Sequence, residues 1–407
     1  MKVDRKSGFF TALLGAVTAL AALSIDMSLP ALPAMTVALS ANGPAAQWTM
    51  SLFVLGFAGG QLFLGPLSDH YGRRPVLLSG LMLYVVTGVA CAMATSIGIL
   101  VAMRFLQGVS ACAGAVVVRA IIRDVFDRPA AAAKQSIMTV VTTLAMLVAP
   151  IVGAWVLGIA GWRGVFALLP VVGGIVLVTA ALVIPETRPK TEGERHGALK
   201  SYLIVLREPT TLGNAFVAAF IFAGLFVFIS GSPTVFIRTQ GISPQKFSWL
   251  FAVVALGQLG GSTLNRTLAM RVTPARLIKV GGGLTVAATA VIALFMILQA
   301  NIYMVTFSIS LYAFALGMTN PNAIAAAMVP LPQHAGAASA VIGFLYFTMA
   351  SIAAALAGYI LPGTVSGMLG IMTVFGFAGI AVLVWLELHY AKRAQPEGKP
   401  REPLSEF

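Results

Sequence analysis

Charged residues are scarce in this 407-residue chain. Aspartate, glutamate, lysine and arginine together make up 10% of it, whereas a soluble globular protein carries about 25%. Apolar residues reach 58%, and the mean hydropathy is +0.93. Domains this poor in charge do not stay in solution, which excludes a water-soluble enzyme and a disordered protein. The sequence therefore indicates a polytopic membrane protein.

Cysteine and acidic residues are scarce as well. The only two cysteines, Cys91 and Cys112, sit inside apolar segments, so no disulfide framework is expected. The 26 basic residues outnumber the 13 acidic ones and give a net charge of +13. A nucleic-acid-binding protein gathers its basic residues on one face, but here they fall between long apolar runs. This distribution excludes nucleic acid as a partner and is typical of loops between membrane spans.

A helix needs about 20 apolar residues to cross the hydrocarbon layer of a bilayer. Twelve stretches meet this requirement: 9–29, 47–67, 76–94, 98–119, 135–157, 163–184, 212–235, 247–265, 276–298, 302–327, 337–360 and 366–388. We therefore predict an all-α membrane protein with twelve transmembrane helices. The first span is too long for a signal peptide and no cleavage site follows it, so we expect it to be retained.

The basic residues predict the orientation, because cytoplasmic loops are enriched in Lys and Arg. With a cytoplasmic N-terminus, the inner loops and tails hold 22 of the 26 basic residues. The outer side holds only Arg163, Arg238 and Lys246, and Arg104 lies within a span. We expect both termini in the cytoplasm.

One long polar connection divides the chain into two halves. We predict an N-terminal six-helix bundle at 1–187, a cytoplasmic linker at 188–211, a C-terminal six-helix bundle at 212–388 and a cytoplasmic tail at 389–407. An internal repeat supports the division: at a constant offset of 201, Trp48 matches Trp249, Gly56 matches Gly257, and the glycines at 59–60 match those at 260–261. Two like halves suit a transporter that rocks around a central site.

The loop between the second and third spans reads GPLSDHYGRRP over residues 65–75. Its glycines permit a tight turn, and its arginines favour the cytoplasmic side. Through Gly65, Asp69, Gly72, Arg73 and Arg74 it resembles the signature loop of the major facilitator superfamily, Gly-x-Leu-x-Asp-x-x-Gly-Arg-Arg/Lys. The resemblance implies the two-bundle major facilitator fold and a cytoplasmic latch between its halves. The alternative is a solvated loop that only fixes the topology.

Asp26 is the only carboxylate well inside a span, and such a residue by default marks a functional site. From a rise of about 1.5 Å per residue, Asp26 lies about 27 Å and Arg104 about 21 Å above the cytoplasmic face, so we expect the two to pair. Arg keeps its charge whereas Asp can discharge, so Asp26 can take a proton and release its partner. The alternatives are a permanent ion pair or a helix cap at the interface.

Two further motifs lie in the fourth and fifth spans. Arg104, Gln107 and Gly108 resemble a motif of the proton-driven members of the superfamily. Residues 145–154, which include Pro150 and Gly153, resemble the exporter motif Gly-x-x-x-Gly-Pro-x-x-Gly-Gly, with alanine at three of the glycine positions. Small residues let helices approach closely, and proline kinks a helix. Sealing of the pathway and simple helix packing both account for these residues.

Segments in both halves resemble one branch of the superfamily, the Bcr/CflA drug-resistance transporters. These segments are residues 26–33, 65–75, 119–124, 222–226 and 335–339. The resemblance implies export of small antibiotics or metabolites, driven by the proton gradient and without a cofactor. Some related multidrug exporters carry a second acid at the position of Thr18, and its absence here speaks against recognition of cationic drugs.

We expect a mostly apolar ligand cavity with a few polar groups, as is usual for small-molecule sites. The candidates are Phe222, Phe226 and Phe228 in the seventh span, Gln258 in the eighth, and Asn320 and Asn322 in the tenth. Core packing or lipid contact is the alternative for each phenylalanine. The charged residues at the depth of the cavity are one acid, Asp26, and one base, Arg104. Since Asp26 is the expected proton site, no other carboxylate is left to bind a cation. We therefore expect uncharged or zwitterionic substrates, such as amphenicol-like or bicyclic-dione antibiotics.

Together these features favour a monomeric proton-coupled antiporter of the bacterial inner membrane, with a small-molecule substrate, protons and the bilayer as its partners. Proton-coupled uptake, or export of a normal metabolite, is the alternative within the superfamily. A membrane receptor or scaffold would carry a soluble signalling domain, and an enzyme would carry a catalytic or metal-ligating cluster in its spans. Neither is found in the sequence, so we expect no enzyme activity and no metal.

Overall fold

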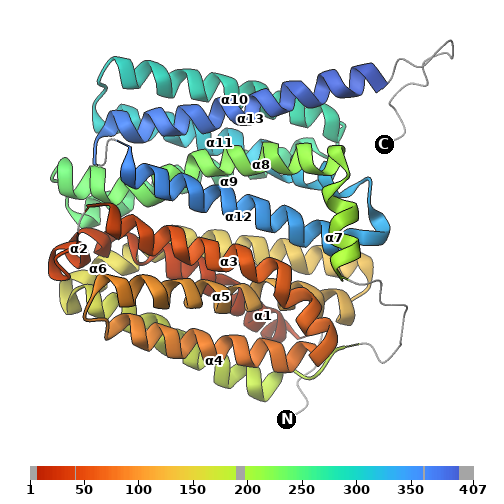
Figure 1. Cartoon of the computed structure of the whole chain (residues 1–407), viewed down its shortest axis with the longest axis horizontal. Coiled ribbons are helices and arrows are strands. Elements are labelled where there is room, and N and C mark those ends of the chain that lie inside the picture. Colours follow the sequence, from red (N-terminus) through yellow and green to blue (C-terminus); the bar gives the residue numbers. More distant parts are fainter. Residues whose placement is uncertain (1–6, 42, 189–197, 361–362, 394–407) are drawn as a thin grey trace.

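The computed structural model describes residues 7–41, 43–188, 198–360 and 363–393, which fold into helices joined by short connections (Figure 1). In chain order the elements are α1 (Gly8–Asp26), η1 (Leu29–Ala31), α2 (Leu32–Ala38), α3 (Gly43–Tyr71), α4 (Arg73–Ala92), α5 (Ile97–Val125), α6 (Arg128–Val183), α7 (Ala198–Leu206), α8 (Pro209–Ser232), η2 (Pro233–Thr239), α9 (Pro244–Leu268), α10 (Pro274–Ile297), α11 (Ile302–Met328), η3 (Pro332–His334), α12 (Ala335–Tyr359) and α13 (Val365–Arg393).

The helices begin where the sequence supplies a cap or a proline. The Ser7 side chain accepts a hydrogen bond from the Phe10 N–H at the start of α1, and Ser96 does the same for Ile99 at the start of α5. Asn301 caps α11. Proline occupies the first turn of α6, α8, α9 and α10, where its missing N–H leaves no helical bond unmade. After each start, a long apolar run continues as a helix because a helix satisfies its own backbone polar groups in lipid.

Eleven helical segments of the described chain are long and apolar enough to cross a membrane, but one of them, α6, makes two crossings. Its 56 residues would extend about 84 Å, against a hydrocarbon layer of about 30 Å. The helix breaks at Gly161, whose positive φ of 65° favours glycine. The arm before the break packs on α1, where Gly15 meets Val141, and the arm after it packs on α4, where Gly173 meets Tyr84. Twelve crossings result, as predicted.

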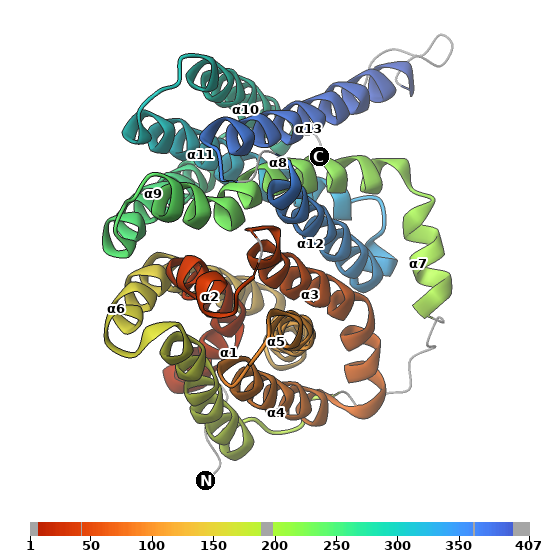
Figure 2. The same cartoon turned by 60° about the vertical axis from the view of Figure 1, so that its left-hand side comes forward.

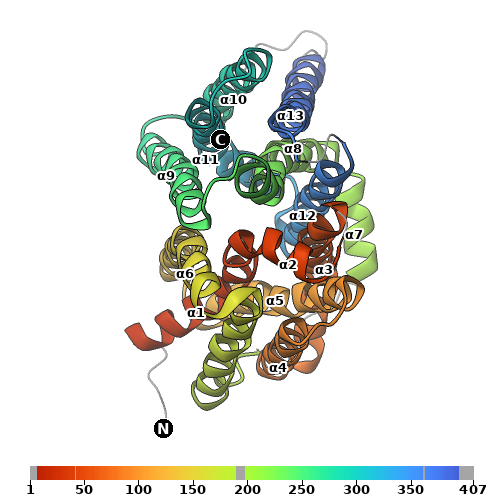
Figure 3. The ribbon, with the colours of Figure 1, turned by 90° about the vertical axis from the view of Figure 1, so that its left-hand side faces the viewer.

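The crossing helices form two bundles that lie side by side (Figures 2 and 3). α1 and α3 to α6 build the N-terminal bundle, and α8 to α13 build the C-terminal bundle. The most extensive packing between them is that of α3 along α12 and of α6 along α9. We call the end that carries α7 the linker end (right in Figure 1) and the opposite end the distal end. The predicted fold class is confirmed.

The repeat at an offset of 201 has a structural counterpart in the two bundles. A Cβ at Gly56 of α3 would overlap the carbonyl oxygen of Phe105 on α5. In the C-terminal bundle, a Cβ at Gly257 of α9 would overlap the carbonyl oxygen of Ser310 on α11. Equivalent glycines thus permit the same close helix crossing in each half.

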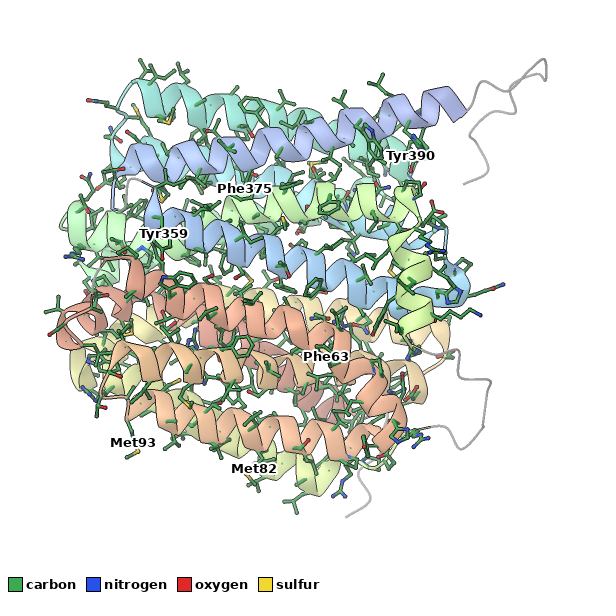
Figure 4. The ribbon with its side chains drawn as sticks, viewed as in Figure 1. Phe63, Met82, Met93, Tyr359, Phe375 and Tyr390 are labelled. Atoms are coloured by element: carbon green, nitrogen blue, oxygen red, sulfur yellow. The ribbon has the colours of Figure 1, made fainter. Side chains whose placement is uncertain are left out.

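Apolar side chains cover the outer surface of the bundles. Phe63 is 71% exposed, Met82 54% and Met93 72% (Figure 4). Large exposed apolar surfaces need an apolar environment, which a bilayer supplies. With the spanning helices, this surface identifies a multi-pass membrane protein.

The helix ends differ slightly from the predicted domain boundaries. The predicted linker at 188–211 contains helix α7, α8 begins within it at Pro209, and α13 extends beyond 388 to Arg393. The linker residues 189–197 and the tail residues 394–407 lie outside the described residues. The boundaries of the two bundles stay a prediction.

Candidate functional site

Arg104 lies in the core of the N-terminal bundle, fully buried on α5. Its Nη1 donates to Oε1 of Gln107 at 2.9 Å, and its Nη2 donates to the Ser24 carbonyl of α1 at 3.1 Å. At Gly108 a Cβ would overlap the Phe53 carbonyl, and this close approach of α3 places the Phe53 ring centroid 4.2 Å from the guanidinium carbon. A cation is attracted to the face of such a ring. The charge of Arg104 is therefore held by neutral groups.

Tyr84 of α4 also contacts α1 at Ser24. Its hydroxyl lies 2.6 Å from Oγ of Ser24. Ser24 donates its own proton to the Leu20 carbonyl at 2.7 Å, so Tyr84 is the donor of the first bond. The sequence analysis missed Tyr84, because a single tyrosine in an apolar span carries no pattern that separates it from a lipid-facing residue.

Asp26 ends α1 and is 2% exposed, and it is the only acidic residue in the buried class within the described chain. The predicted ion pair with Arg104 is not formed in this structure: none of the ion pairs of the described residues includes Asp26. The predicted depth agrees with the structure to the extent that Arg104 binds the carbonyl of Ser24, two residues before Asp26. Depth along a helix does not fix the direction of a side chain, and the guanidinium points to the backbone of α1 instead.

Gly153 brings α6 against the end of α1. A Cβ at Gly153 would overlap the carbonyl oxygen of Met27, the residue after Asp26. One turn earlier, the Pro150 carbonyl accepts a hydrogen bond from Oγ of Ser248 on α9 at 2.8 Å. The small residues of the predicted exporter motif thus serve close packing beside Asp26 and at the bundle interface. Sealing of a pathway stays a prediction.

Arg73 organises the loop between α3 and α4. It pairs with Asp69, donates to Oγ of Ser68 at 2.8 Å, and pairs with Asp124 of α5 at 2.9 Å. Ser68 in turn donates to the carbonyl of Gly65. The Asp124 side chain is 7% exposed and that of Asp69 57%. All these partners belong to the N-terminal bundle, and a latch to the other bundle stays a prediction.

Glu186 caps α4 from a distant part of the chain. Its carboxylate accepts backbone N–H bonds from Arg73 at 2.8 Å, Arg74 at 3.2 Å and Arg188 at 2.9 Å. Burial raises the pKa of Glu186, but these N–H bonds outweigh it and hold the pKa below its usual value. Gly72, at φ 103°, leaves room for the carboxylate, which a Cβ there would meet. The sequence analysis missed Glu186, because in the sequence this residue follows the end of α6 and nothing there links it to the start of α4.

An aromatic cluster joins the bundles midway along α3, α8 and α12. Phe222 stacks on Tyr346, with ring centroids 4.1 Å apart and planes 13° apart, and Phe226 lies 5.7 Å from Phe222. Phe347 of α12 contacts Phe57 of α3 at 4.7 Å, across the interface. Two predicted cavity residues therefore do come together, with Tyr346 and Phe347 as partners that the sequence did not single out.

The two predicted asparagines lie in different surroundings. Asn320 donates from Nδ2 to the Tyr346 hydroxyl at 3.1 Å, which places it beside the aromatic cluster. Asn322 donates to Oδ1 of Asn265 on α9 at 2.7 Å and to the Met318 carbonyl at 2.8 Å. The Asn322 amide is thus engaged in packing between α9 and α11.

Phe228 and Gln258 line a separate small pocket between the bundles. Met146 of α6 lines it on one side, and Phe228, Phe251 and Gln258 line it on the other. The six predicted cavity residues are therefore divided among three places.

Arg119 lies on α5 toward the linker end. Its Nη2 donates to Oε1 of Gln61 on α3 at 3.1 Å, and the Gln61 side chain lies against Gly343 of α12. Arg119 itself is exposed. The sequence analysis used this residue only for the family resemblance, because a basic residue near a span end is ordinary.

Comparisons with known proteins identify the family. The model of the Major Facilitator Superfamily matches residues 14–354. The chain is 33% identical over 351 residues to the uncharacterized MFS-type transporter YdgK of Bacillus subtilis, covering 85% of this chain and 87% of that protein. It is 27% identical to the bicyclomycin resistance protein homolog of Haemophilus influenzae, over 91% and 94% of the two chains. It is also 27% identical to the multidrug transporter MdfA of Escherichia coli, over 88% and 87%.

Solved structures have the same fold. A bacterial homolog of the human lysosomal transporter Spinster, in an inward-facing and occupied conformation, matches with a TM-score of 0.74 at 15% identity, covering 97% of this chain and 100% of that one. The xylose transporter XylE of Escherichia coli, in a partially occluded inward-open conformation, matches with a TM-score of 0.71 at 14% identity, over 96% and 99%. The resemblance stated from the loop motif is confirmed. The chain belongs to the major facilitator superfamily and is a multi-pass membrane transporter, related to drug-resistance transporters, and not an enzyme.

Proposed function

We propose that this transporter is a proton-coupled antiporter that exports small neutral or zwitterionic compounds by alternating access. The observation that carries the proposal is the state of Asp26, a deeply buried carboxyl without an ion pair beside the buried cation of Arg104. Burying an ionised carboxylate without a partner is costly, so this arrangement suits a carboxyl that holds a proton. A second arrangement, in which Asp26 is ionised and meets Arg104, would release that proton.

The second arrangement requires the side chain of Asp26 or of Arg104 to change direction. Arg104 already binds the carbonyl of Ser24, two residues before Asp26 on α1. Gly153 of α6 touches the backbone of Met27 on the other side of Asp26, and the same arm of α6 bonds to α9 through Pro150 and Ser248. A shift of the bundles at this contact would therefore act directly on Asp26, which couples its protonation to the opening of the site.

The substrate preference follows from the charges at the interface. Phe222 and Phe226 belong to the aromatic cluster, Asn320 lies beside it, and none of the three carries a charge. Asp26, the one acidic residue in the buried class within the described chain, is assigned to the proton, so a cationic drug that used this carboxyl would compete with the proton. The proposed substrates are thus neutral or zwitterionic, in line with the drug-resistance names of the relatives.

The bacterial relatives favour a bacterial inner-membrane location. The distribution of Lys and Arg favours both termini in the cytoplasm, since basic residues concentrate in loops on that side. The linker end, with the Arg73 loop and α7, then faces the cytoplasm. No further subunit is needed for the proposed cycle, so we propose a monomer with the substrate, protons and the bilayer as its partners.

Substrate-induced proton flux in proteoliposomes tests the proposal. With a pH-sensitive dye inside, a neutral bicyclic-dione antibiotic or a zwitterionic compound should move protons opposite to the compound in the wild type but not in Asp26→Asn. Asp127→Asn, an exposed carboxylate at the start of α6, is the matched control and should behave as wild type. Proton movement in the same direction as the compound would make the protein an uptake symporter, and coupled transport by Asp26→Asn would refute the role of Asp26.

A further inference from the structure

One buried acceptor at the aromatic cluster has no partner. Asn320 is 5% exposed, and its Nδ2 donates to the hydroxyl of Tyr346. Its Oδ1 is fully buried and accepts no hydrogen bond from any described residue. Leaving such an acceptor unsatisfied costs about 1–3 kcal/mol, and an unpaired group of this kind calls for an explanation.

The hydroxyl of Tyr346, beside Asn320, has a donor without a partner. The Tyr346 oxygen accepts from Asn320, so its own proton is left over, and no described residue accepts it. The Tyr346 ring is fixed by its stack on Phe222, with centroids 4.1 Å apart. The direction of the hydroxyl is therefore set by packing as well as by the bond to Asn320.

These two groups lie close to the region where the bundles meet. Tyr346 is half-buried and lies among helices α8, α11 and α12 through Phe222 and Asn320. The neighbouring ring of Phe347 contacts Phe57 of the other bundle. A ligand between the bundles would thus meet apolar rings together with one fixed donor and one fixed acceptor.

We infer that Asn320 and Tyr346 form a recognition site for an amide group of the substrate, of the kind that presents C=O and N–H on the same edge. The Tyr346 O–H donates to the amide oxygen, and Asn320 Oδ1 accepts from the amide N–H. Ring amides such as lactams, and primary carboxamides, have this edge, whereas an open-chain trans amide carries the two groups on opposite sides. The inference rests on the proposed function, because it names the substrate class of the same site.

Other polar groups match this pair less well. A carboxylate would place a negative charge against the Asn320 carbonyl oxygen, and a quaternary ammonium ion has neither a donor nor an acceptor. An ester or an N-methylated amide satisfies Tyr346 but leaves Asn320 Oδ1 unpaired. A site built to hydrogen-bond a substrate discriminates against the analogue that lacks the bonding group, because a buried polar group is then left without a partner.

The test uses an aryl-substituted six-membered lactam and its N-methyl derivative, with affinities measured by equilibrium dialysis of the purified full chain in detergent micelles. The wild type should bind the lactam at least tenfold more tightly than the N-methyl compound. Asn320→Leu should remove this discrimination by weakening only the lactam. Tyr346→Phe should weaken both compounds by about three- to tenfold, since both keep the carbonyl.

Tyr359→Phe is the matched control. It lies on the same helix, keeps its ring against Trp48, and should change neither affinity. Thermal unfolding of each variant shows that it is folded. Equal affinity of the wild type for the two compounds, or no binding of the lactam, would overturn the inference, as would unchanged discrimination in Asn320→Leu. Antiport of another compound that still depends on Asp26 would then leave the proposed function standing, whereas coupled transport by Asp26→Asn would refute that function and not the amide site.

Discussion

The two bundles share one arrangement of helices but place different chemistry in it. In the N-terminal bundle, Arg104 of α5 donates to the Ser24 carbonyl of α1 at 3.1 Å. In the C-terminal bundle, Tyr312 of α11 donates to the Ile221 carbonyl of α8 at 2.9 Å. Both side chains are fully buried, and both reach from the fourth helix of their bundle to the backbone of the first.

The comparison separates what the fold requires from what the function requires. A long side chain with a hydrogen-bond donor can reach from the fourth helix to a carbonyl of the first, and the neutral phenol of Tyr312 makes this bond. A buried guanidinium costs far more to desolvate than a phenol, so stability alone does not explain Arg104. The charge fits the proton site proposed at Asp26, whereas the amide site proposed at Asn320 and Tyr346 lies in the bundle that has the neutral donor.

The largest expected effect concerns the two equivalent donors, Arg104 and Tyr312. Arg104→Met should lower proton-driven export at least 100-fold, because it removes the buried cation that is proposed to pair with Asp26. Tyr312→Phe should lower it no more than about tenfold, since it removes one neutral hydrogen bond worth about 1 kcal/mol. Export into everted membrane vesicles, normalised to the amount of folded protein, measures both. Equal losses in the two variants would mean that Arg104 has only a structural role.

The next effect concerns the backbone contact beside Asp26. Gly153→Val should abolish transport and lower the thermal unfolding temperature, because its side chain would collide with the Met27 carbonyl and overpacking costs about 1–3 kcal/mol or more. Gly158→Val on the same arm of α6 is the control, since its nearest neighbour, the Gln245 amide, is 4.0 Å away. A normal Gly153→Val protein would show that α1 and α6 do not need this close approach.

A smaller effect separates the two carboxylates of the Arg73 loop. Asp124→Asn should destabilise the protein more than Asp69→Asn, because a buried ion pair leaves an uncompensated charge when broken, while an exposed one contributes less than about 1 kcal/mol. Thermal unfolding in detergent compares them, and equal shifts would contradict the difference in burial.

Asp69→Asn also tests the predicted latch. If the loop holds the bundles together on the inside, this variant should shift single-cysteine labelling toward the inward-open form despite its small effect on stability. Unchanged labelling would leave the loop a determinant of topology and of packing within the N-terminal bundle.

The smallest effect is the pH dependence that Glu186 contributes. Its pKa in the folded protein is held below the usual value of 4.5, so its stabilising effect is complete above that value and is lost as the pH falls through the lower, folded-state pKa. The unfolding temperature of the wild type should exceed that of Glu186→Gln at pH 6, and the difference should shrink below pH 4. A difference that does not change with pH would contradict the capping role.

Much of the architecture followed from the sequence, because lipid imposes a simple rule on it. A run of about 20 apolar residues in a bilayer becomes a helix, since no water is present to satisfy the backbone. The twelve spans, the division into two halves and the family could all be predicted on that basis and from the loop at 65–75. The glycines at 56 and 257 could be found from the internal repeat, because a close helix crossing tolerates no side chain at these positions.

The site needed the tertiary structure, because hydropathy does not report the rotation of a helix about its axis. The sequence placed Asp26 and Arg104 at similar depth, but only the packing directs Arg104 to the Ser24 carbonyl instead of the carboxylate. Likewise, Asn320 and Asn322 differ by two positions in the sequence, yet one lies beside Tyr346 and the other binds Asn265. A residue two positions farther along a helix points about 200° away, so the packing of the neighbouring helices decides what each side chain contacts.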